Sequence, residues 1–387
     1  MKYFIIQKGA KVMKRVKIGV IGCGMISDIY LKNMTTLFAD VLEVCACANR
    51  HPQRALKKAE EFHIRAMTID EILEDKEIEV ILNLTIPEVH YEINKKSLLA
   101  GKHVYSEKPL ASSLEEGKEL LELAKQKHLL IASAPDTFLG GGLQTCRKIL
   151  DRGLIGKPVF AQGLLLSSGP EVFHPNPVFF YKKGAGPLLD MGPYYLTALI
   201  ALFGGVRRVV GMGKCITPIR KVLVEGSSEC GRDFPCEVDT FNSGTIEFEN
   251  GLIANLTVAW DMNYFYWESG MPLLTVYGTE GTMILPDPNT FGGIGGHPAE
   301  EPGKYIKVRQ GQGEFQEIPV EFDYVQNSRG IGVADMATCI RAGGEPRVSG
   351  ENSLHVLEMM LGFLESDRQG KYYEMQTRGH KPEPLYK

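Results

Sequence analysis

The first third of the chain alternates between two hydrophobic periods. Short apolar runs rich in β-branched residues fall at 16–22, 41–48, 79–85, 103–105 and 129–133. Segments with apolar residues at helical spacing separate them, at 25–37, 52–62, 88–100 and 112–127. Strands and helices alternating at this spacing predict a mostly parallel, doubly wound α/β sheet covered on both faces.

The hydrophobic pattern changes after about residue 140. A helical segment at 143–152 is followed by period-2 segments, of which 245–260 is the clearest, because Asn250-Gly251 separates two alternating runs as in a β-hairpin. Further strands are predicted at 273–277, 282–285 and 305–309, a long glycine-rich loop around 292–296, and closing helices at 331–341 and 353–367. We expect a second, α+β domain whose mostly antiparallel sheet carries helices on one face.

The length of 387 residues agrees with two domains. We place an N-terminal extension at 1–13, the α/β domain at 14–139 and the second domain at 140–387. The composition is 44% hydrophobic and 23% charged, which excludes wholesale disorder. A formal charge of −4 without a dense Lys/Arg block argues against nucleic acid or an acidic membrane surface as partner.

The chain shows no targeting or metal-binding signal. The apolar run at 3–6 is too short for a secretory signal, and no stretch approaches the ~20 apolar residues of a membrane helix. Cys45 and Cys47 lie inside an apolar run, and Cys230 and Cys236 have no partners at zinc spacing. We therefore expect reduced thiols, no metal site and a cytoplasmic protein.

A glycine-rich turn, Gly22-Cys23-Gly24-Met25-Ile26-Ser27, follows the first predicted strand and opens a helix. Gly22 permits a tight turn, and Gly24 lets the backbone approach a pyrophosphate at the helix N-terminus, where Met25 and Ile26 begin the helix. The small Ser27 replaces a third glycine and still allows close helix–strand packing. The turn, strand and helix together predict dinucleotide binding.

The end of the second predicted strand bears on the choice of cofactor. An NAD-preferring site usually has an acidic residue there for the ribose hydroxyls, whereas this chain has Asn49 and Arg50. Asn49 does not repel a 2′-phosphate, and Arg50 is able to bond it. The pattern favours NADP over NAD. In the alternative interpretation, Arg50 is a solvated loop residue and NAD is used.

Two further segments supply candidate catalytic residues. Lys108, in Glu107-Lys108-Pro109, follows a predicted strand at the edge where ligands bind, and we expect burial and the cofactor to lower its pKa for proton transfer. Asp190 and Tyr194 are four residues apart and share one face of a helix beginning near Pro187. Ordinary alternatives are a surface lysine, a first-turn acid and a core tyrosine.

These segments resemble the glucose–fructose oxidoreductase / inositol dehydrogenase / MocA-like (Gfo/Idh/MocA) family. The resemblance rests on the glycine turn, the Glu-Lys-Pro segment and residues 184–194 in the same order, and it covers nearly all of residues 14–370. It implies a Rossmann domain followed by a domain with a large open sheet, which often mediates oligomerisation. We therefore expect a homo-oligomer, a dimer or a tetramer, formed through that sheet.

The resemblance also implies roles for individual residues. Glu107 would contact the nicotinamide ribose, Lys108 would lie beside the site of hydride transfer, and Asp190 would match the family's catalytic-helix aspartate. Tyr194 stands where many members have His, which shifts the proton role towards Lys108. The remaining cofactor contacts would come from Thr85, Pro87 and His90, with Pro87 standing where many members have an asparagine.

A sugar or polyol is the expected substrate, oxidised at a hydroxyl carbon by NAD(P). His174 and Tyr181 precede the catalytic helix, and Trp260 beside Asp261 gives an aromatic face next to an acid, which suits a sugar. The alternative for each is ordinary packing. Arg329 is assigned no role. Two other functions stay open: redox-neutral, NAD-dependent cleavage of glycosides, and non-catalytic dinucleotide sensing.

Overall fold

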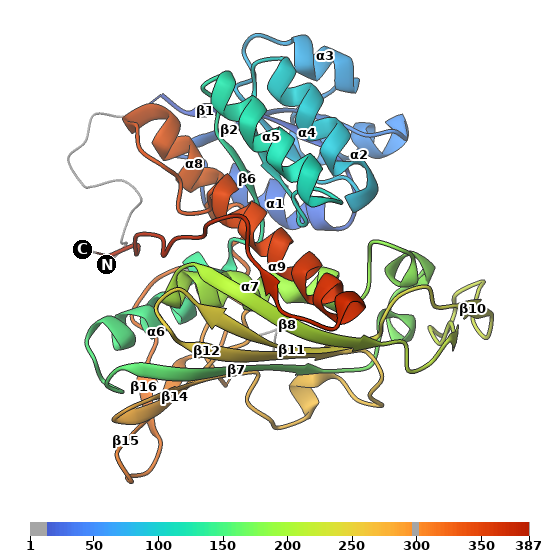
Figure 1. The fold of residues 1–387 in the computed structure, drawn as a ribbon. Helices are drawn as coiled ribbons and strands as arrows, with labels where there is room; N and C mark the ends of the chain where they lie inside the picture. The colour runs from blue at the N-terminus through green and yellow to red at the C-terminus, as the bar shows by residue number, and fades with distance from the viewer. Residues whose placement is uncertain (1–13, 296–301, 387) are drawn as a thin grey trace.

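A computed structural model describes residues 14–295 and 302–386 of the chain. The predicted extension at 1–13, the loop residues 296–301 and residue 387 lie outside the described residues. Figure 1 shows two layered parts: a sheet flanked by helices (β1–β6) and a larger sheet (β7–β17) with helices between the two. Among the described residues, no helix is long and apolar enough to span a membrane.

The first sheet is a parallel Rossmann sheet with strand order β3-β2-β1-β4-β5-β6. Its strands are β1 (Val16–Ile21), β2 (Leu42–Ala48), β3 (Arg65–Ala66), β4 (Val80–Asn83), β5 (His103–Ser106) and β6 (Ile131–Ser133). Its helices are α1 (Ile26–Thr35), α2 (Pro52–Phe62), α3 (Ile69–Glu74), α4 (His90–Leu99) and α5 (Leu114–Gln126). The predicted doubly wound sheet is confirmed. Strand order reverses between β1 and β4, the position where such sheets bind ligands.

The second sheet has nine strands in the order β16-β15-β14-β13-β7-β12-β11-β8-β17. They are β7 (Pro158–Leu166), β8 (Val206–Lys214), β11 (Phe241–Phe248), β12 (Ile253–Ala259), β13 (Leu274–Gly278), β14 (Gly281–Leu285), β15 (Tyr305–Gln310), β16 (Gln316–Pro319) and β17 (Tyr373–Glu374). Only β7 and β12 pair in parallel, so the prediction of a mostly antiparallel sheet is confirmed. A separate two-stranded ribbon joins β9 (Ile219–Lys221) and β10 (Asp233–Pro235).

The predicted hairpin is the antiparallel pair β11–β12, with Gly251 in the turn at a φ of 84°. The neighbouring strands β7 and β8 were not singled out from the sequence. In β7 the outward residues are themselves apolar, among them Phe160, Leu164 and Leu166, so polar and apolar positions do not alternate. A central strand with two apolar faces lacks the period-2 signal on which the prediction depends.

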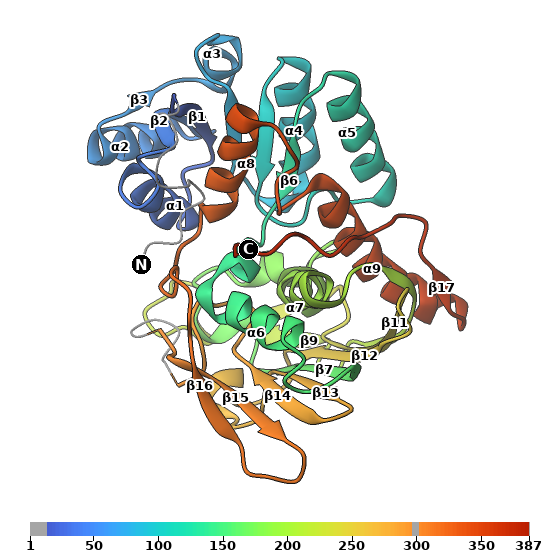
Figure 2. The ribbon, with the colours of Figure 1, turned by 90° about the vertical axis from the view of Figure 1, so that its left-hand side faces the viewer.

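Helices cover one face of the large sheet, as expected. They are α6 (Gly141–Asp151), α7 (Pro187–Phe203) and α9 (Gly350–Gln369), seen between the two sheets in Figures 1 and 2. Helix α8 (Ile331–Ala342) instead returns to the first sheet, where Arg341 pairs with Glu79 at 2.6 Å. Helix α9 contacts both parts: Ser353 Oγ donates to the backbone oxygen of Ser133, the last residue of β6, while the same helix packs along β8.

Candidate active site

Three loops of the candidate site follow three neighbouring strands that end in register. Ile21 of β1 pairs with Asn83 of β4, and Asn83 pairs with Ser106 of β5. The next residues are therefore the glycine turn, the segment from Leu84, and Glu107-Lys108. The register of the parallel strands brings these loops to one edge of the sheet, at the carboxyl ends where such sheets bind ligands.

The glycine turn has the form that the sequence predicts. Gly22 has a φ of 111°, and a Cβ there would lie 2.5 Å from the backbone of Leu84, so only glycine fits. At Gly24 the space that a Cβ would occupy is open. Ser27 is fully buried, and its Oγ donates to the Gly24 carbonyl oxygen at 2.6 Å. The turn thus presents open backbone at the start of α1, as a pyrophosphate requires.

Lys108 and Asp190 form a direct ion pair between the two parts of the molecule. The Lys108 Nζ lies 2.7 Å from Asp190 Oδ1 and 2.7 Å from the Asp190 backbone oxygen. Asp190 is in the first turn of α7, which begins at Pro187 and continues through Pro193. Tyr194, one turn further, places its ring centroid 5.2 Å from the Lys108 Nζ. The predicted shared helix face is confirmed by these two contacts.

The charge environment of Lys108 differs from the expectation. Burial lowers the pKa of Lys108, but Asp190, then Tyr194 and Glu107, outweigh burial and raise it above its ordinary value. The lysine side chain is 14% exposed, so its attraction to Asp190 is weakly screened. The downward pKa shift expected from burial was wrong, because the Asp190 carboxylate outweighs burial and holds Lys108 charged.

Arg329, to which the sequence assigned no role, lies beside Tyr194. Its guanidinium donates from Nη2 to Asn289 Oδ1 at 2.9 Å and from Nη1 to Asn327 Oδ1 at 2.9 Å. Burial lowers the pKa of Arg329, but the nearby Tyr194 raises it above its ordinary value. Arg329 directly precedes the Gly330 turn into α8, far along the chain from Tyr194. No local pattern marks it as a site residue, because only the return of the chain to the first sheet brings it there.

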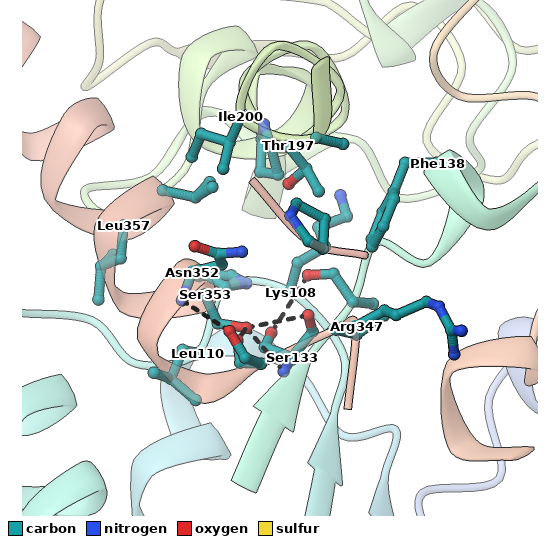
Figure 3. A pocket seen from close by; sticks show the side chains of 18 of the residues that line it. Lys108, Leu110, Ser133, Phe138, Thr197, Ile200, Arg347, Asn352, Ser353 and Leu357 are labelled. Atoms are coloured by element: carbon teal, nitrogen blue, oxygen red, sulfur yellow. Dashed lines mark hydrogen bonds between the residues drawn. The ribbon is translucent and has the colours of Figure 1, made fainter. Parts of the chain in front are cut away.

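Two cavities border this constellation. One of about 650 Å³ is lined by Arg329 and Asn289 together with Tyr266 and Asp287, whose side chains bond each other at 2.8 Å. The other, of about 30 Å³, lies behind Lys108 between α7 and α9, near Thr197 and Asn352 (Figure 3). The larger cavity has the size of a small-molecule site, whereas the smaller one holds about one water.

The predicted cofactor contacts on the loops after β4 and β5 have different surroundings. Glu107 accepts a hydrogen bond from the Tyr30 hydroxyl at 2.9 Å, and Thr85 Oγ1 donates to Asn83 at 2.6 Å. His90 is fully buried, with its ring nitrogens 2.7 Å from the Pro109 carbonyl oxygen and 2.9 Å from that of Thr85. His90 therefore holds the two loops against each other. Pro87 begins the short helix Pro87–Val89 on the same edge.

The residues expected to choose between cofactors stand at the end of β2. Asn49 Oδ1 accepts the His51 backbone N–H at 3.1 Å, and Arg50 is exposed. Within residues 14–295 and 302–386, the Arg50 side chain has no hydrogen-bond or ion-pair partner. Its guanidinium is therefore available to a ligand.

Two of the four expected substrate residues, Tyr181 and Trp260, belong to a buried cluster beside α7, and none of the four lines the larger cavity. The Arg220 guanidinium pairs with Asp261 and lies 4.8 Å from the Tyr181 ring centroid, and Trp260 packs edge-on against Tyr181 at 5.5 Å. His174 contacts the rings of two phenylalanines nearby. The predicted aromatic residue and acid do lie next to each other, but within the described residues the Asp261 carboxylate is paired with Arg220.

The described residues contain no group of three or more His, Cys, Asp or Glu side chains placed to hold a metal ion. All eight cysteines are free thiols.

Comparison with known families agrees with this geometry. Residues 16–134 match the oxidoreductase family with an NAD-binding Rossmann fold, and residues 143–284 match the GFO/IDH/MocA C-terminal domain. The chain belongs to the GFO/IDH/MocA family. The resemblance inferred from the three motifs is therefore confirmed, and the second matched domain begins at residue 143, near the change in hydrophobic pattern at about residue 140.

Individual relatives are distant. An uncharacterized oxidoreductase of Schizosaccharomyces pombe is 31% identical over 201 residues, 50% of this chain and 53% of the relative. A D-xylose dehydrogenase of Paenarthrobacter nicotinovorans is 25% identical over 225 residues, 56% of each chain. These matches span about half the length of each relative. A levoglucosan dehydrogenase structure with NADH and L-sorbose superposes with a TM-score of 0.78 at 19% identity, covering 94% of this chain and 100% of that one.

Proposed function

We propose that this protein is an NAD(P)-dependent oxidoreductase that transfers hydride between the nicotinamide and a hydroxyl-bearing carbon of a sugar or polyol. The observation that carries the proposal is the Lys108–Asp190 pair, joined at 2.7 Å across the two parts of the molecule and placed at the carboxyl edge of a dinucleotide-binding sheet. A sensor that only bound dinucleotide would not need this buried acid–base pair.

The residues at the sheet edge fit a dinucleotide. The open backbone at Gly24 and the start of α1 at Met25 and Ile26 suit the pyrophosphate, and Glu107 and Thr85 lie along the same edge towards Lys108. We assign His90 to positioning, since its ring bridges the Thr85 and Pro109 carbonyls. When bound, the cofactor supplies or accepts the hydride; the protein's residues manage the proton.

The proton chemistry follows from the charge on Lys108. Its raised pKa keeps the ammonium protonated at neutral pH, so Lys108 donates a proton to a carbonyl oxygen in the reducing direction. In the oxidising direction the neutral amine accepts the hydroxyl proton, and Asp190 then stabilises the ammonium that forms. The Tyr194 hydroxyl, on the ring beside Lys108 and near the Arg329 guanidinium, is the second proton group beside the same substrate oxygen.

The proposed substrate class rests on the cavity and on the relatives. The cavity of about 650 Å³ offers amide, phenol, carboxylate and guanidinium groups that suit a polyhydroxylated ligand. A D-xylose dehydrogenase is among the relatives. The four residues expected from the sequence, His174, Tyr181, Trp260 and Asp261, remain candidates only for a more distant part of the substrate.

The test is reduction of NAD and NADP against a panel of sugars, inositols and glycosides, run beside the Lys108→Ala variant. We expect turnover by the wild type and a loss in kcat of about 10²–10⁴-fold in the variant, with little change in dinucleotide affinity. A variant with a near-normal rate would remove Lys108 from the chemistry. Release of an aglycone without net NAD(P)H would indicate the redox-neutral glycoside reaction instead.

For the cofactor we propose a preference for NADP over NAD. Asn49 stands where an NAD site usually has an acid, and the exposed Arg50 guanidinium has no partner within the described residues. A 2′-phosphate would give Arg50 a charge-assisted hydrogen bond.

For the assembly we propose a homo-oligomer, a dimer or a tetramer, that pairs the uncovered face of the large sheet. On that face Phe160 and Tyr277 stack at 5.7 Å, and Met212 is 75% exposed. An apolar sheet face of this kind is stabilised by burial against a second copy. Light scattering of the purified protein tests this assembly, and a monomer at micromolar concentration would contradict it.

We also propose a cytoplasmic location, because the eight cysteines are free thiols.

A further inference from the structure

The Arg329 guanidinium lines the larger cavity without an acid to balance its charge. It donates to two neutral acceptors, Asn289 Oδ1 and Asn327 Oδ1, at 2.9 Å each. Among the residues that the structure describes, it makes no ion pair. The two amide oxygens therefore hold the guanidinium in place, but they leave its positive charge and further N–H groups available to a ligand.

The charged groups that line this cavity are unequal in number. Among the described residues there are two cations, Arg329 and Lys307, and one acid, Asp287. Asp287 accepts the Tyr266 hydroxyl at 2.8 Å and a backbone N–H at 2.9 Å, so neutral donors occupy both of its oxygens. Lys307 stands opposite Glu317 in the β15–β16 pair. Arg329 is thus the cation of the lining that faces the cavity with no acid across from it.

The acids on the Rossmann side of Arg329 are also held by neutral donors. Asp136 is buried after β6, and one of its oxygens accepts two backbone N–H groups at the start of α8, at 3.0 Å each. Glu107 accepts the Tyr30 hydroxyl at 2.9 Å and the Lys108 N–H at 3.1 Å. These bonds satisfy both carboxylates, and in the described structure neither forms an ion pair with Arg329.

Backbone contacts hold Arg329 near the site of hydride transfer. Its carbonyl oxygen accepts Asn33 Nδ2 of α1 at 2.9 Å. Tyr30, one turn earlier on α1, donates to Glu107, the residue directly before Lys108. The same helix therefore connects Arg329 to the loop that carries the proposed catalytic lysine, at the opposite end of the cofactor site from the glycine turn.

We propose that Arg329 binds an anionic group of the substrate, so that the preferred substrate is a sugar or polyol that carries a carboxylate or a phosphate. This inference rests on the proposed function and names the substrate class of the same site. A guanidinium fixed in one orientation offers planar donors that a carboxylate or a phosphate accepts in bidentate form. A neutral hydroxyl group would leave the charge of Arg329 unbalanced in a half-buried position, where water screens it less than at the surface.

The experiment compares pairs of substrates that differ in one anionic group, in a buffer free of phosphate. The pairs are D-galactose with D-galacturonate and D-glucose with D-glucose 6-phosphate, which separate a carboxylate from a phosphate. The ratio of kcat/KM within each pair is measured for the wild type, Arg329→Met and Arg329→Lys. A change in kcat that both members of a pair share cancels in this ratio.

The matched control is Arg309→Met. Arg309 is an exposed arginine of β15 whose guanidinium lies 5.3 Å from the Phe315 ring centroid, and it does not line the cavity. Two binding measurements accompany the kinetics. Fluorescence quenching gives the dinucleotide Kd, and tryptophan fluorescence, to which Trp267 of the cavity contributes, reports binding of galacturonate without turnover.

We expect the wild type and Arg309→Met to prefer the anionic member of at least one pair by about tenfold or more, as for a charge-assisted hydrogen bond. Arg329→Met should abolish this preference, mainly through a higher KM for the anionic substrate. Arg329→Lys should keep part of it, because the charge remains and the planar fork is lost. The dinucleotide Kd should be the same in all four proteins.

Equal kcat/KM within both pairs in the wild type would overturn the proposal and leave the proposed function in place. A preference that survives in Arg329→Met would overturn it as well. So would a weaker dinucleotide Kd in that variant, since the guanidinium would then serve the cofactor. Absence of turnover with every sugar would contradict the proposed function, and the galacturonate titration would still show whether the anion binds through Arg329.

Discussion

The ammonium of Lys108 lies 2.7 Å from a carboxylate oxygen of Asp190, 82 residues further along the chain. Lys108 comes from the loop after β5 in the Rossmann sheet, and Asp190 from the first turn of the helix that covers the second sheet. The pair is only partly exposed, so the carboxylate raises the pKa of the ammonium despite burial. The protonation state of the proposed catalytic lysine is therefore set by the packing of the two parts.

Replacing Asp190 by Asn should shift the pH dependence of sugar oxidation to lower pH. Oxidation requires the neutral amine, so the rate rises as pH increases through the pKa of Lys108. Since Asp190 raises that pKa, its removal lowers it, and the rise of kcat/KM with pH moves to lower pH. The measurement is a pH profile of kcat/KM for both proteins.

The matched control for this profile is Glu119→Gln. Glu119 pairs with Lys95 at 2.6 Å on the surface, so the variant removes one carboxylate of an ion pair without touching the site. Its profile should coincide with that of the wild type. An unshifted profile in Asp190→Asn would show that the carboxylate does not control the titrating group.

Tyr194 and Arg329 should act as one unit. Tyr194→Phe removes the hydroxyl, and we expect a loss in kcat of about 10²-fold for a proton group of this kind. Arg329→Met should lower kcat through the same hydroxyl, because it removes a positive charge beside Tyr194. In the Tyr194→Phe background, Arg329→Met should then add little.

A double-mutant cycle on kcat checks this coupling, with Arg329→Lys as the conservative variant that should recover part of the rate. Multiplied losses in the double variant would show that Arg329 acts independently of Tyr194. If Arg329→Met and Arg329→Lys lowered the thermal stability of the protein by the same amount, the result would indicate a structural role for Arg329.

The sequence correctly predicts the motifs whose geometry is determined by residues close to them in the chain. Gly22 needs its positive φ because of the strand and helix on either side of it, and Asp190 and Tyr194 share a face because they are four residues apart. Arg329 could not be found this way, since α8 brings it to Tyr194 only when the chain returns to the first sheet.

Long-range packing also determines the pKa of Lys108 and the partners of Trp260 and Asp261. The sign of the Lys108 shift depends on Asp190, whose approach no local pattern encodes. An aromatic residue beside an acid suggested a sugar-binding pair at Trp260 and Asp261, but Arg220, from the β9–β10 ribbon, already pairs with that acid. The sequence identifies an aromatic residue next to an acid, but Arg220, the partner of that acid, comes from another part of the chain.

Cofactor preference should follow the end of β2. Asn49→Asp places a carboxylate where a 2′-phosphate would lie, so we expect the ratio of kcat/KM for NADP over NAD to fall by about tenfold, the effect of roughly 1.4 kcal/mol. Arg50→Ala should weaken NADP alone. Arg54→Ala, which removes an exposed arginine from α2, is the control. A ratio that neither Asn49→Asp nor Arg50→Ala changes would contradict the proposed NADP preference.

Acid should destabilise the protein through His355 of α9. Its Nε2 accepts the Val206 N–H at 3.0 Å, its Nδ1 lies 2.8 Å from Thr377 Oγ1, and burial lowers its pKa to about 4. The unfolded chain has a histidine pKa near 6.5, so it binds the proton more tightly than the folded protein. The stabilisation is complete above about pH 6.5 and is lost as pH falls towards 4, by about 3 kcal/mol.

Urea midpoints measured from pH 7 to pH 4.5 test this loss in the wild type, in His355→Gln and in the control His51→Gln, whose side chain is exposed. His355→Gln should be less stable at pH 7, because it loses a fitted buried ring, but its midpoint should fall less steeply on acidification. Carboxylates titrate alike in all three proteins, so the difference in slope reports His355. Parallel slopes in the wild type and His355→Gln would show that another group carries the acid sensitivity.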